Sequence, residues 1–272
     1  MNPTIITSDE QLRSFLPNQI PVVKGEVSLF DKIGNFINSA EQWVFSTFIS
    51  QTYCEKLVDN PLYAQLQAIV ACEALRKAVA SLDLILTPNG FATVGSQNLA
   101  VASKARVDRL IGQLIAGRDD AIVGFLRGVA AILPDWLNTV QGRYFSATLF
   151  PTPELADLVG QSTDRWEKWL SLRASVIDIE ASLAEEYFSP ELMGTLRRSV
   201  AKGIVRPLAE AIRSQVVMCL QDKPVNHRRM MDLVNFIRNR PDDFPEWHYS
   251  ETAKLYRPPV FTNQKEAKGY WF

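Results

Sequence analysis

The chain has 272 residues, of which 47% are hydrophobic and 22% are charged, and its formal net charge at pH 7 is −1. These proportions are typical of a globular protein and exclude an intrinsically disordered chain. The near-neutral charge provides no global basic field that would favour nucleic acid as a partner. The length is compatible with one large domain or with two small ones.

The cysteines and the apolar segments bear on the cellular environment. Cys54, Cys72 and Cys219 are widely spaced and odd in number, which fits neither a disulfide framework nor zinc-ligand spacing. We therefore expect free thiols that are buried. The first residues lack the layout of a signal peptide, and the longest uncharged window, residues 84–103, contains helix breakers that exclude a membrane helix. We expect a soluble protein with no membrane partner.

Helical spacing begins near the N-terminus. Residues Thr7 to Glu10 predict a capping box, which opens a short helix that Pro17 ends. Apolar residues then recur at steps of three and four, so they share one helical face. This first stripe consists of Phe30, Ile33, Ile37, Ala40, Val44 and Phe48.

A longer stripe follows Asn60-Pro61 and predicts the clearest helix of the chain. Its members are Leu62, Leu66, Ile69, Cys72, Leu75, Val79, Leu82 and Leu86, whereas Gln67, Glu73, Lys77 and Asp83 fall outside it. Because an isolated helix is marginal in water, we expect the two stripes to pack against each other.

A turn at residues 87–90 precedes a short alternating run at Phe91–Val94, which predicts one small strand. Ser103 can cap a helix that runs to about Ala116. Gly117 and Asp119 then indicate a helix end followed by a new N-cap, and the second helix ends at Pro134.

Residues 143–153 are the main interruption of the helical pattern. We therefore divide the chain into an N-terminal helical half, residues 1–142, and a C-terminal helical half, residues 143–240, with a second possible short strand at residues 144–149. A long helix then carries Trp169, Leu172, Val176, Ile179, Leu183 and Tyr187.

Two further helices complete the second half. Ser189-Pro190 begins one of them, and we expect that helix to bend between Gly203 and Pro207. The last helix holds Met230, Leu233, Val234 and Ile237. The predicted fold class is all-α, mainly an α-helical bundle, with at most a small β element and an extended C-terminal arm.

The predicted arm is residues 241–272, where eight of 32 positions are aromatic and four are proline. Proline keeps such a segment extended, and buried aromatics contribute large contact areas. We expect the arm to dock on its own helical body or on a neighbouring subunit, with disorder as the third alternative. Its candidate partner-binding residues are Trp247, Tyr249, Tyr256, Phe261, Tyr270, Trp271 and Phe272.

No catalytic motif is recognisable. The chain has two histidines, His227 and His248, and lacks the common hydrolase, nucleotide-binding and metal-site patterns. Neighbouring residues on a helix point in different directions, so the acid pairs Glu185-Glu186 and Asp119-Asp120 predict no shared chemistry. We therefore predict no catalytic, cofactor-binding or metal-binding residue and no small-molecule substrate, while an enzyme with a dispersed site stays an alternative.

Charge is distributed unevenly along the second half. Residues 151–191 carry nine acids and three bases, whereas residues 192–240 carry ten bases and three acids. The two blocks can be solvated faces with local pairing, complementary contacts between subunits, or a nucleic-acid patch. The basic block lacks interleaved aromatics, so direct nucleic-acid binding is the least favoured of the three.

Two stretches carry a resemblance. Residues 84–94 (LILTPNGFATV), together with Ala102-Ser103 and Val107–Leu110, form the first, and residues 263–272 (NQKEAKGYWF) form the second. Both resemble a prophage-encoded family of Bacteroidetes proteins of unknown function. The shared motifs contain no catalytic residue, so the resemblance transfers no active site.

Members of such families are encoded among phage structural genes. The resemblance therefore implies a head–tail connector or adaptor role, with other phage structural proteins or copies of the same chain as partners. It implies a location in the cytoplasm of the bacterial host or in the virion. A bacterial helical scaffold or regulatory module unrelated to phage is the remaining alternative.

Overall fold

The computed structural model describes residues 5–16, 27–82, 84–87, 90–93 and 104–257, and helices form nearly all of their secondary structure. The elements of the N-terminal part are α1 (Asp9–Ser14), α2 (Leu29–Lys32), α3 (Gly34–Thr47), α4 (Gln51–Glu55), α5 (Pro61–Leu82), β1 (Leu84–Thr87), β2 (Gly90–Thr93), α6 (Lys104–Ile132), η1 (Pro134–Asn138) and α7 (Val140–Phe145). Element η1 is a 3₁₀-helix.

The C-terminal part is also helical, and its element η2 is a π-helical turn. Its elements are α8 (Leu155–Val159), α9 (Arg165–Leu183), η2 (Ala184–Phe188), α10 (Pro190–Ala201), α11 (Pro207–Leu220), α12 (His227–Arg238), α13 (Pro245–His248) and α14 (Glu251–Lys254). The predicted all-α fold class is confirmed.

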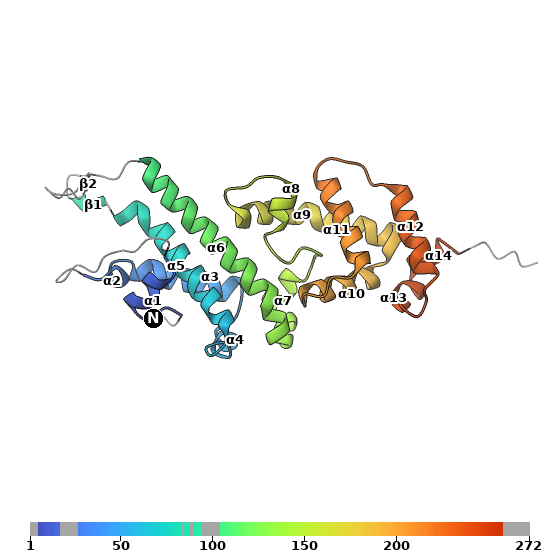
Figure 1. The fold of residues 1–272 in the computed structure, drawn as a ribbon, viewed down its shortest axis with the longest axis horizontal. Coiled ribbons are helices and arrows are strands. Elements are labelled where there is room, and N and C mark those ends of the chain that lie inside the picture. Colours follow the sequence, from blue (N-terminus) through green and yellow to red (C-terminus); the bar gives the residue numbers. More distant parts are fainter. Residues whose placement is uncertain (1–4, 17–26, 83, 88–89, 94–103, 258–272) are drawn as a thin grey trace, which may run out of the picture.

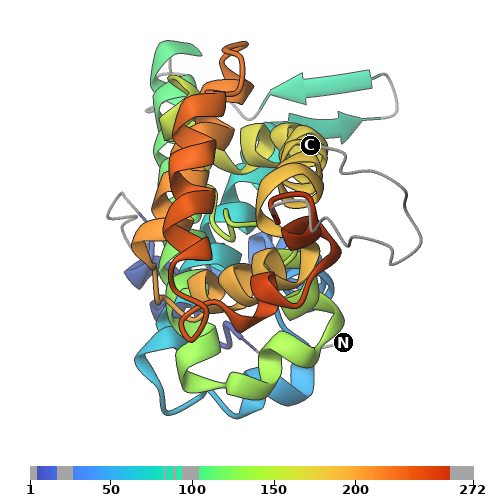
Figure 2. The ribbon, with the colours of Figure 1, turned by 90° about the vertical axis from the view of Figure 1, so that its right-hand side faces the viewer.

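The molecule is elongated (Figure 1). Helices α1 to α6 occupy one end and α8 to α14 the other, and the long helix α6 runs from the first end toward the middle. Figure 2 looks along the long axis, with the C-terminal helices in front of the N-terminal ones. Within the described ranges, no helix is both long enough and apolar enough to cross a membrane.

Strands β1 and β2 form an antiparallel hairpin at the end of the molecule remote from α12, with Leu84 opposite Thr93 and Thr87 opposite Gly90. The strand predicted near Phe91 is present, but it pairs with a second strand that the sequence analysis assigned to the end of a helix. Leu86 therefore leaves the predicted helical stripe. The strand predicted at residues 144–149 is wrong, because α7 continues to Phe145 and a turn follows.

The capping box at α1 is shifted by one residue from the predicted position. Ser8 Oγ accepts a hydrogen bond from Gln11 N at 3.2 Å, and Gln11 Oε1 accepts one from Thr7 N at 2.9 Å. Ser8 is therefore the N-cap, and the Gln11 side chain reaches back one residue beyond it, to Thr7.

Helix α5 is the centre of the N-terminal part, since it packs against α3 on one side and α6 on the other. The predicted contact between the two apolar stripes is confirmed. However, residues 69–75 are all buried in succession, so α5 has no solvent-facing side over two turns. Glu73, which lies outside the predicted stripe, is consequently only 3% exposed.

Helix α6 is continuous, so the helix end predicted at Gly117 to Asp119 is wrong. Gly117 lies where α6 approaches α5 closely, because a Cβ there would be 3.2 Å from Cys72 Sγ. The side chain of Asp119 does not cap α6; it hydrogen-bonds to another part of the chain, as described below.

Aromatic rings join the two parts of the molecule. Ring centroids 5.1 to 5.7 Å apart link Phe48, which follows α3, to Phe145 and Trp166, and link Trp169 of α9 to the same two rings. The indole N–H of Trp169 donates to the carbonyl oxygen of Phe150 at 3.0 Å. The buried apolar residues of both halves therefore belong to one cluster, and the predicted division at residue 142 stays a prediction.

Ser189 caps α10 and Pro190 occupies its first turn, as predicted. The expected bend is instead a complete stop, because α10 ends at Ala201 and α11 begins at Pro207. Gly203 supplies the reason, since its φ of 79° takes the chain into the left-handed region that ends helices.

The segment after α12 is not extended in its described part, which corrects that prediction for residues 241–257. Prolines begin rather than prevent a helical turn there, since Pro245 occupies the first turn of α13. Trp247 is 1% exposed and its indole N–H donates to the carbonyl oxygen of Tyr187 at 2.8 Å. Residues 258–272, with Phe261, Tyr270, Trp271 and Phe272, lie outside the described residues.

The close approach of Gly142 to the backbone of η1 generates a prediction. A Cβ at Gly142 of α7 would lie 2.0 Å from the carbonyl oxygen of Trp136, whereas a Cβ at Gly194 of α10 would meet nothing within 4 Å. We expect Gly142→Ala to destabilise the protein by about 3 kcal/mol or more, because backbone must move. Gly194→Ala should stabilise it by about 0.5 to 1 kcal/mol. Urea unfolding measures both, and equal stabilities would contradict the close approach.

Candidate functional site

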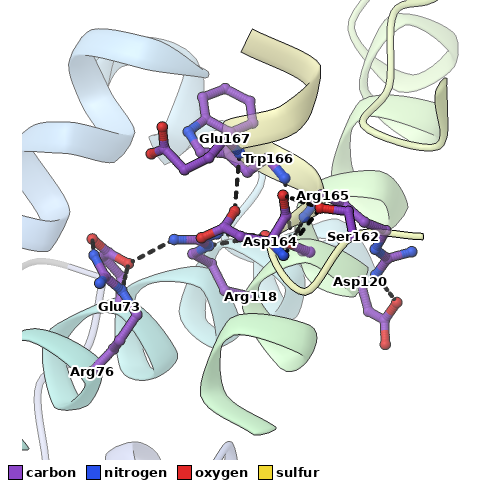
Figure 3. Close-up of polar contacts among 10 residues, drawn as sticks. Glu73, Arg76, Arg118, Asp120, Ser162, Asp164, Arg165, Trp166 and Glu167 are labelled. Carbon is purple, nitrogen blue, oxygen red and sulfur yellow. Dashed lines mark hydrogen bonds and ion pairs between the residues drawn. The ribbon is translucent and has the colours of Figure 1, made fainter. Parts of the chain in front are cut away.

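A buried network of ion pairs lies where α5, α6 and the start of α9 meet (Figure 3). At its centre is Arg118 of α6, whose side chain is 2% exposed. Its Nη1 lies 3.2 Å from Glu73 Oε2, and its Nη2 lies 2.8 Å from both Asp119 Oδ1 and Asp164 Oδ1. Arg76 binds the other oxygen of Glu73 at 2.7 Å. One guanidinium thus joins three carboxylates from three places in the chain.

Two aspartates of this network hold the first turn of α9. Asp164 is the N-cap, and its Oδ1 accepts from Glu167 N at 2.9 Å. Asp119 reaches across from α6, and its Oδ2 accepts from Arg165 N at 2.8 Å and from Trp166 N at 3.3 Å. The free N–H groups of a helix start favour negative charge, so Asp119 and Asp164 both stabilise this end of α9.

The pKa values of the network move in different directions. Burial acts to raise the pKa of Glu73, but the hydrogen bond and charge of Arg76, with the charge of Arg118, lower it below its usual value. Burial raises the pKa of Asp119 despite the opposing charge of Arg118. Burial acts to lower the pKa of Arg118, but the facing carboxylates, Asp119 foremost, outweigh it and raise that pKa. The arginine therefore stays charged.

Two other buried carboxylates also accept hydrogen bonds from backbone N–H groups. Glu180 of α9, 0% exposed, accepts from Leu149 N at 2.8 Å and from Arg197 Nε at 2.7 Å. Glu41 of α3, 3% exposed, accepts from the backbone N–H groups of residues 5 and 6 at 2.7 and 3.1 Å. Each acid fixes a backbone segment that is not itself in a helix, which is a structural task.

A cavity of about 610 Å³ lies beside this junction, between α6, the segment around α8, and the α10–α11 connection. Four of its five charged residues pair with one another: Arg127 with Glu154, and Arg213 Nη1 with Glu210 Oε2 at 3.0 Å; the fifth, Asp157, pairs with Arg165. Arg213 Nε is buried and has no hydrogen-bond partner among the residues that the structure describes. In size the cavity matches a small-molecule pocket, and its lining could contact a ligand with both charged and apolar groups.

The C-terminal segment docks on η2. The end of a helix leaves carbonyl groups without helical donors, and π-helical turns are frequent at functional sites. Tyr256 Oη donates to the carbonyl oxygen of Glu186 at 2.6 Å, and Thr252 Oγ1 donates to that of Ala184 at 3.4 Å. With the indole contact of Trp247, these bonds hold residues 245–256 against their own chain.

The predicted partner-binding residues therefore have different environments. Trp247 is buried and Tyr256 is half-buried, both against η2, whereas Tyr249 is 88% exposed. The structure brings Trp247 and Tyr256 into ring contact at 6.1 Å and leaves Tyr249 apart in solvent. Partner binding by these residues stays a prediction.

The residues singled out for chemistry are also dispersed. His227 Nδ1 hydrogen-bonds with Tyr187 Oη, and His248 Nε2 lies 3.2 Å from the carbonyl oxygen of Ile237. All three thiols are free, Cys54 and Cys72 are buried, and burial raises their pKa values to about 12 and about 11. In the described part of the chain, no group of three or more potential ligands could hold a metal ion.

The ion-pair network was missed by sequence reasoning, although a signal existed. Leu114, Arg118 and Ile122 are spaced by four residues, which places the arginine on the buried face once α6 is taken as continuous. The break assumed at Gly117 hid this spacing. Glu73 had a similar signal, because it is a lone charge within an apolar run from Ile69 to Leu75.

Comparison with known proteins gives one match. A family of unknown function (DUF6712) matches the chain over residues 20–146 and 225–257, which together exceed half of its length. The chain belongs to this family. Glu73, Arg118 and Asp119 lie within the DUF6712 match, whereas Asp164 and Glu180 lie between its two segments. No curated protein and no solved structure matches the chain.

Neighbouring aspartates on α6 provide a matched test of the network. Asp119→Asn places an amide N–H₂ against the donors of Arg118 and of the α9 backbone, so we expect a loss of about 3 kcal/mol of stability. Within the described ranges Asp120 pairs only with Arg165, and its side chain is 73% exposed. Asp120→Asn should change stability by less than about 1 kcal/mol. Denaturant unfolding of both variants decides, and a comparable loss in each would contradict the assignment.

Glu73 should make the free energy of unfolding depend on pH in the acidic range. Its pKa is lowered in the folded state, so its contribution is present above the ordinary glutamate pKa of about 4.3 and is lost as pH falls through the folded value. We expect Glu73→Gln to cost about 3 kcal/mol at pH 7 and progressively less in acid. Urea unfolding across this pH range measures the difference, and a constant gap between variant and wild type would disprove it.

Proposed function

We propose that the protein is a non-enzymatic structural or adaptor protein of a phage particle, resembling a head–tail connector, that acts through contacts with copies of itself or with other phage structural proteins. The observation that carries the proposal is apolar exposure near the C-terminal end of the described chain. Tyr249 is 88% exposed and Leu255 is 71% exposed, although both belong to a segment whose other side is firmly docked.

Exposure of this kind favours a contact surface. A tyrosine and a leucine held outward on an ordered segment lose little conformational entropy on binding, and tyrosine is a frequent anchor in interfaces. Phe236 and Met231 on the adjacent helix α12 are also exposed, at 39% and 38%. The phage context comes from the sequence resemblance, and a location in the host cytoplasm or the virion follows from the same proposal.

The buried charges support the same reading. Arg118, Asp119 and Glu180 bind helix ends and backbone segments. Such contacts make the body rigid, which suits a structural protein. An enzyme with a dispersed site is the second candidate, because the cavity of about 610 Å³ is lined by Arg213, whose buried Nε has no partner within the described part of the chain.

The proposal is tested by comparing two double variants of the full chain. Tyr249→Ser with Leu255→Ser removes the proposed contacts, and Val140→Ser with Val58→Ser removes apolar groups of 77% and 55% exposure elsewhere. We expect the first variant to weaken self-association, or binding to co-expressed particle proteins, by about tenfold or more. The second should bind as wild type does. Light scattering at several concentrations and co-purification give the readout.

Mass spectrometry of particles released by a host that encodes the chain tests the phage context directly. The chain should be present at a constant ratio to the other particle proteins. A chain that is absent from particles, and that stays monomeric without partners at all concentrations, would contradict the proposal.

A further inference from the structure

A second cavity, of about 360 Å³, lies between the corner formed by η1 and α7 and the C-terminal half of α10. It is separate from the ion-pair network and from the larger cavity. Its lining residues are Leu137, Asn138, Arg143, Ser146 and Arg198. The four polar side chains can all donate hydrogen bonds, and no carboxylate of the described residues lines the cavity. The lining therefore carries two positive charges and no negative one.

Neither arginine of this cavity is bound to a carboxylate of the described residues. Arg143 Nε donates one long bond, 3.4 Å, to the carbonyl oxygen of Thr139, and across the described ranges neither guanidinium forms an ion pair with an acid. Other arginines near the junction of the two halves do form such pairs: Arg118, Arg127, Arg165, Arg197 and Arg213. Arg143 and Arg198 are thus available to a ligand.

Helix position explains each arginine singly but not their convergence. Arg143 lies in the last turn of α7 and Arg198 in the last turn of α10, where a cation complements the free carbonyl groups. Two cations that face one cavity repel each other, however, and an anion bound between them converts that repulsion into attraction. Both arginines are exposed, so solvent screens this repulsion, and their two unpaired guanidiniums form a positive rim that favours an anionic ligand.

We propose that this cavity binds a phosphate-type oxyanion, held between Arg143 and Arg198 with donors from Ser146 and Asn138. The planar guanidinium suits phosphate because it can donate two parallel hydrogen bonds to two oxygens. The cavity falls at the lower end of the size range of small-molecule sites, so it admits a group larger than phosphate alone. The ligand is a phosphorylated small molecule or a phosphodiester stretch of a nucleic acid.

The test uses pyrophosphate and a short single-stranded oligonucleotide, titrated separately into the full chain at constant ionic strength. Arg198→Gln and Arg143→Gln should each lower the affinity for pyrophosphate by about tenfold, since each removes a charge-assisted contact. The control is Arg228→Gln, an exposed residue of α12 in the same basic block, which should change the affinity by less than about twofold. Calorimetry measures pyrophosphate and fluorescence anisotropy measures the oligonucleotide.

The two probes distinguish the sources of the phosphate. Pyrophosphate binding alone indicates a free phosphorylated compound, whereas oligonucleotide binding that pyrophosphate displaces, with the same arginine dependence, indicates a nucleic-acid backbone. Failure of both probes to bind wild type, or an equal loss in Arg228→Gln, would overturn the proposal. Among the described residues neither cavity arginine forms an ion pair, so both variants should fold and lose at most about 1 kcal/mol of stability from the helix end. Either variant alone suffices for the comparison.

Discussion

The architecture depends on buried carboxylates that accept hydrogen bonds from backbone N–H groups far away in sequence. Asp119 holds the first turn of α9, Glu180 holds Leu149 in the non-helical connection, and Glu41 holds residues 5 and 6. A buried charge without partners costs several kcal/mol, so each of these helices has one position in which its acid is satisfied. Apolar packing gathers the helices, and the carboxylates select how the irregular segments lie against them.

Asp119 is the most consequential of these acids because it acts between the two parts of the molecule. Asp119 lies on α6, which packs on α5, and both Asp119 and Glu73 of α5 bind Arg118. The other carboxylate oxygen of Asp119 accepts hydrogen bonds from the start of α9. The aromatic rings of Phe145, Trp166 and Trp169 add apolar contact at the same junction. A segment outside the DUF6712 match is thereby anchored on residues inside it, and the two parts share one core.

The proposals for function rest on groups that this architecture does not use. Tyr249 and Leu255 extend from a segment that Trp247, Thr252 and Tyr256 hold on η2, so they are held outward at little entropic cost. Arg143 and Arg198 line a common cavity, and no acid of the described residues pairs with either of them. The first pair suits a protein partner and the second an anion, and both kinds of contact are compatible with a component that joins other parts of a particle.

The sequence by itself determined the helical fold class, most helix positions and the apolar faces, because steps of three and four residues report local geometry directly. It also indicated Ser189 as a helix cap. Tertiary structure decided the rest. Glu73 and Arg118 are buried because α5 is covered on two sides. Gly117 allows α6 to lie close to α5, and carbonyl oxygens of η2 accept hydrogen bonds from side chains of residues 245–256. Local spacing contains no record of such contacts, since they join residues up to 70 positions apart.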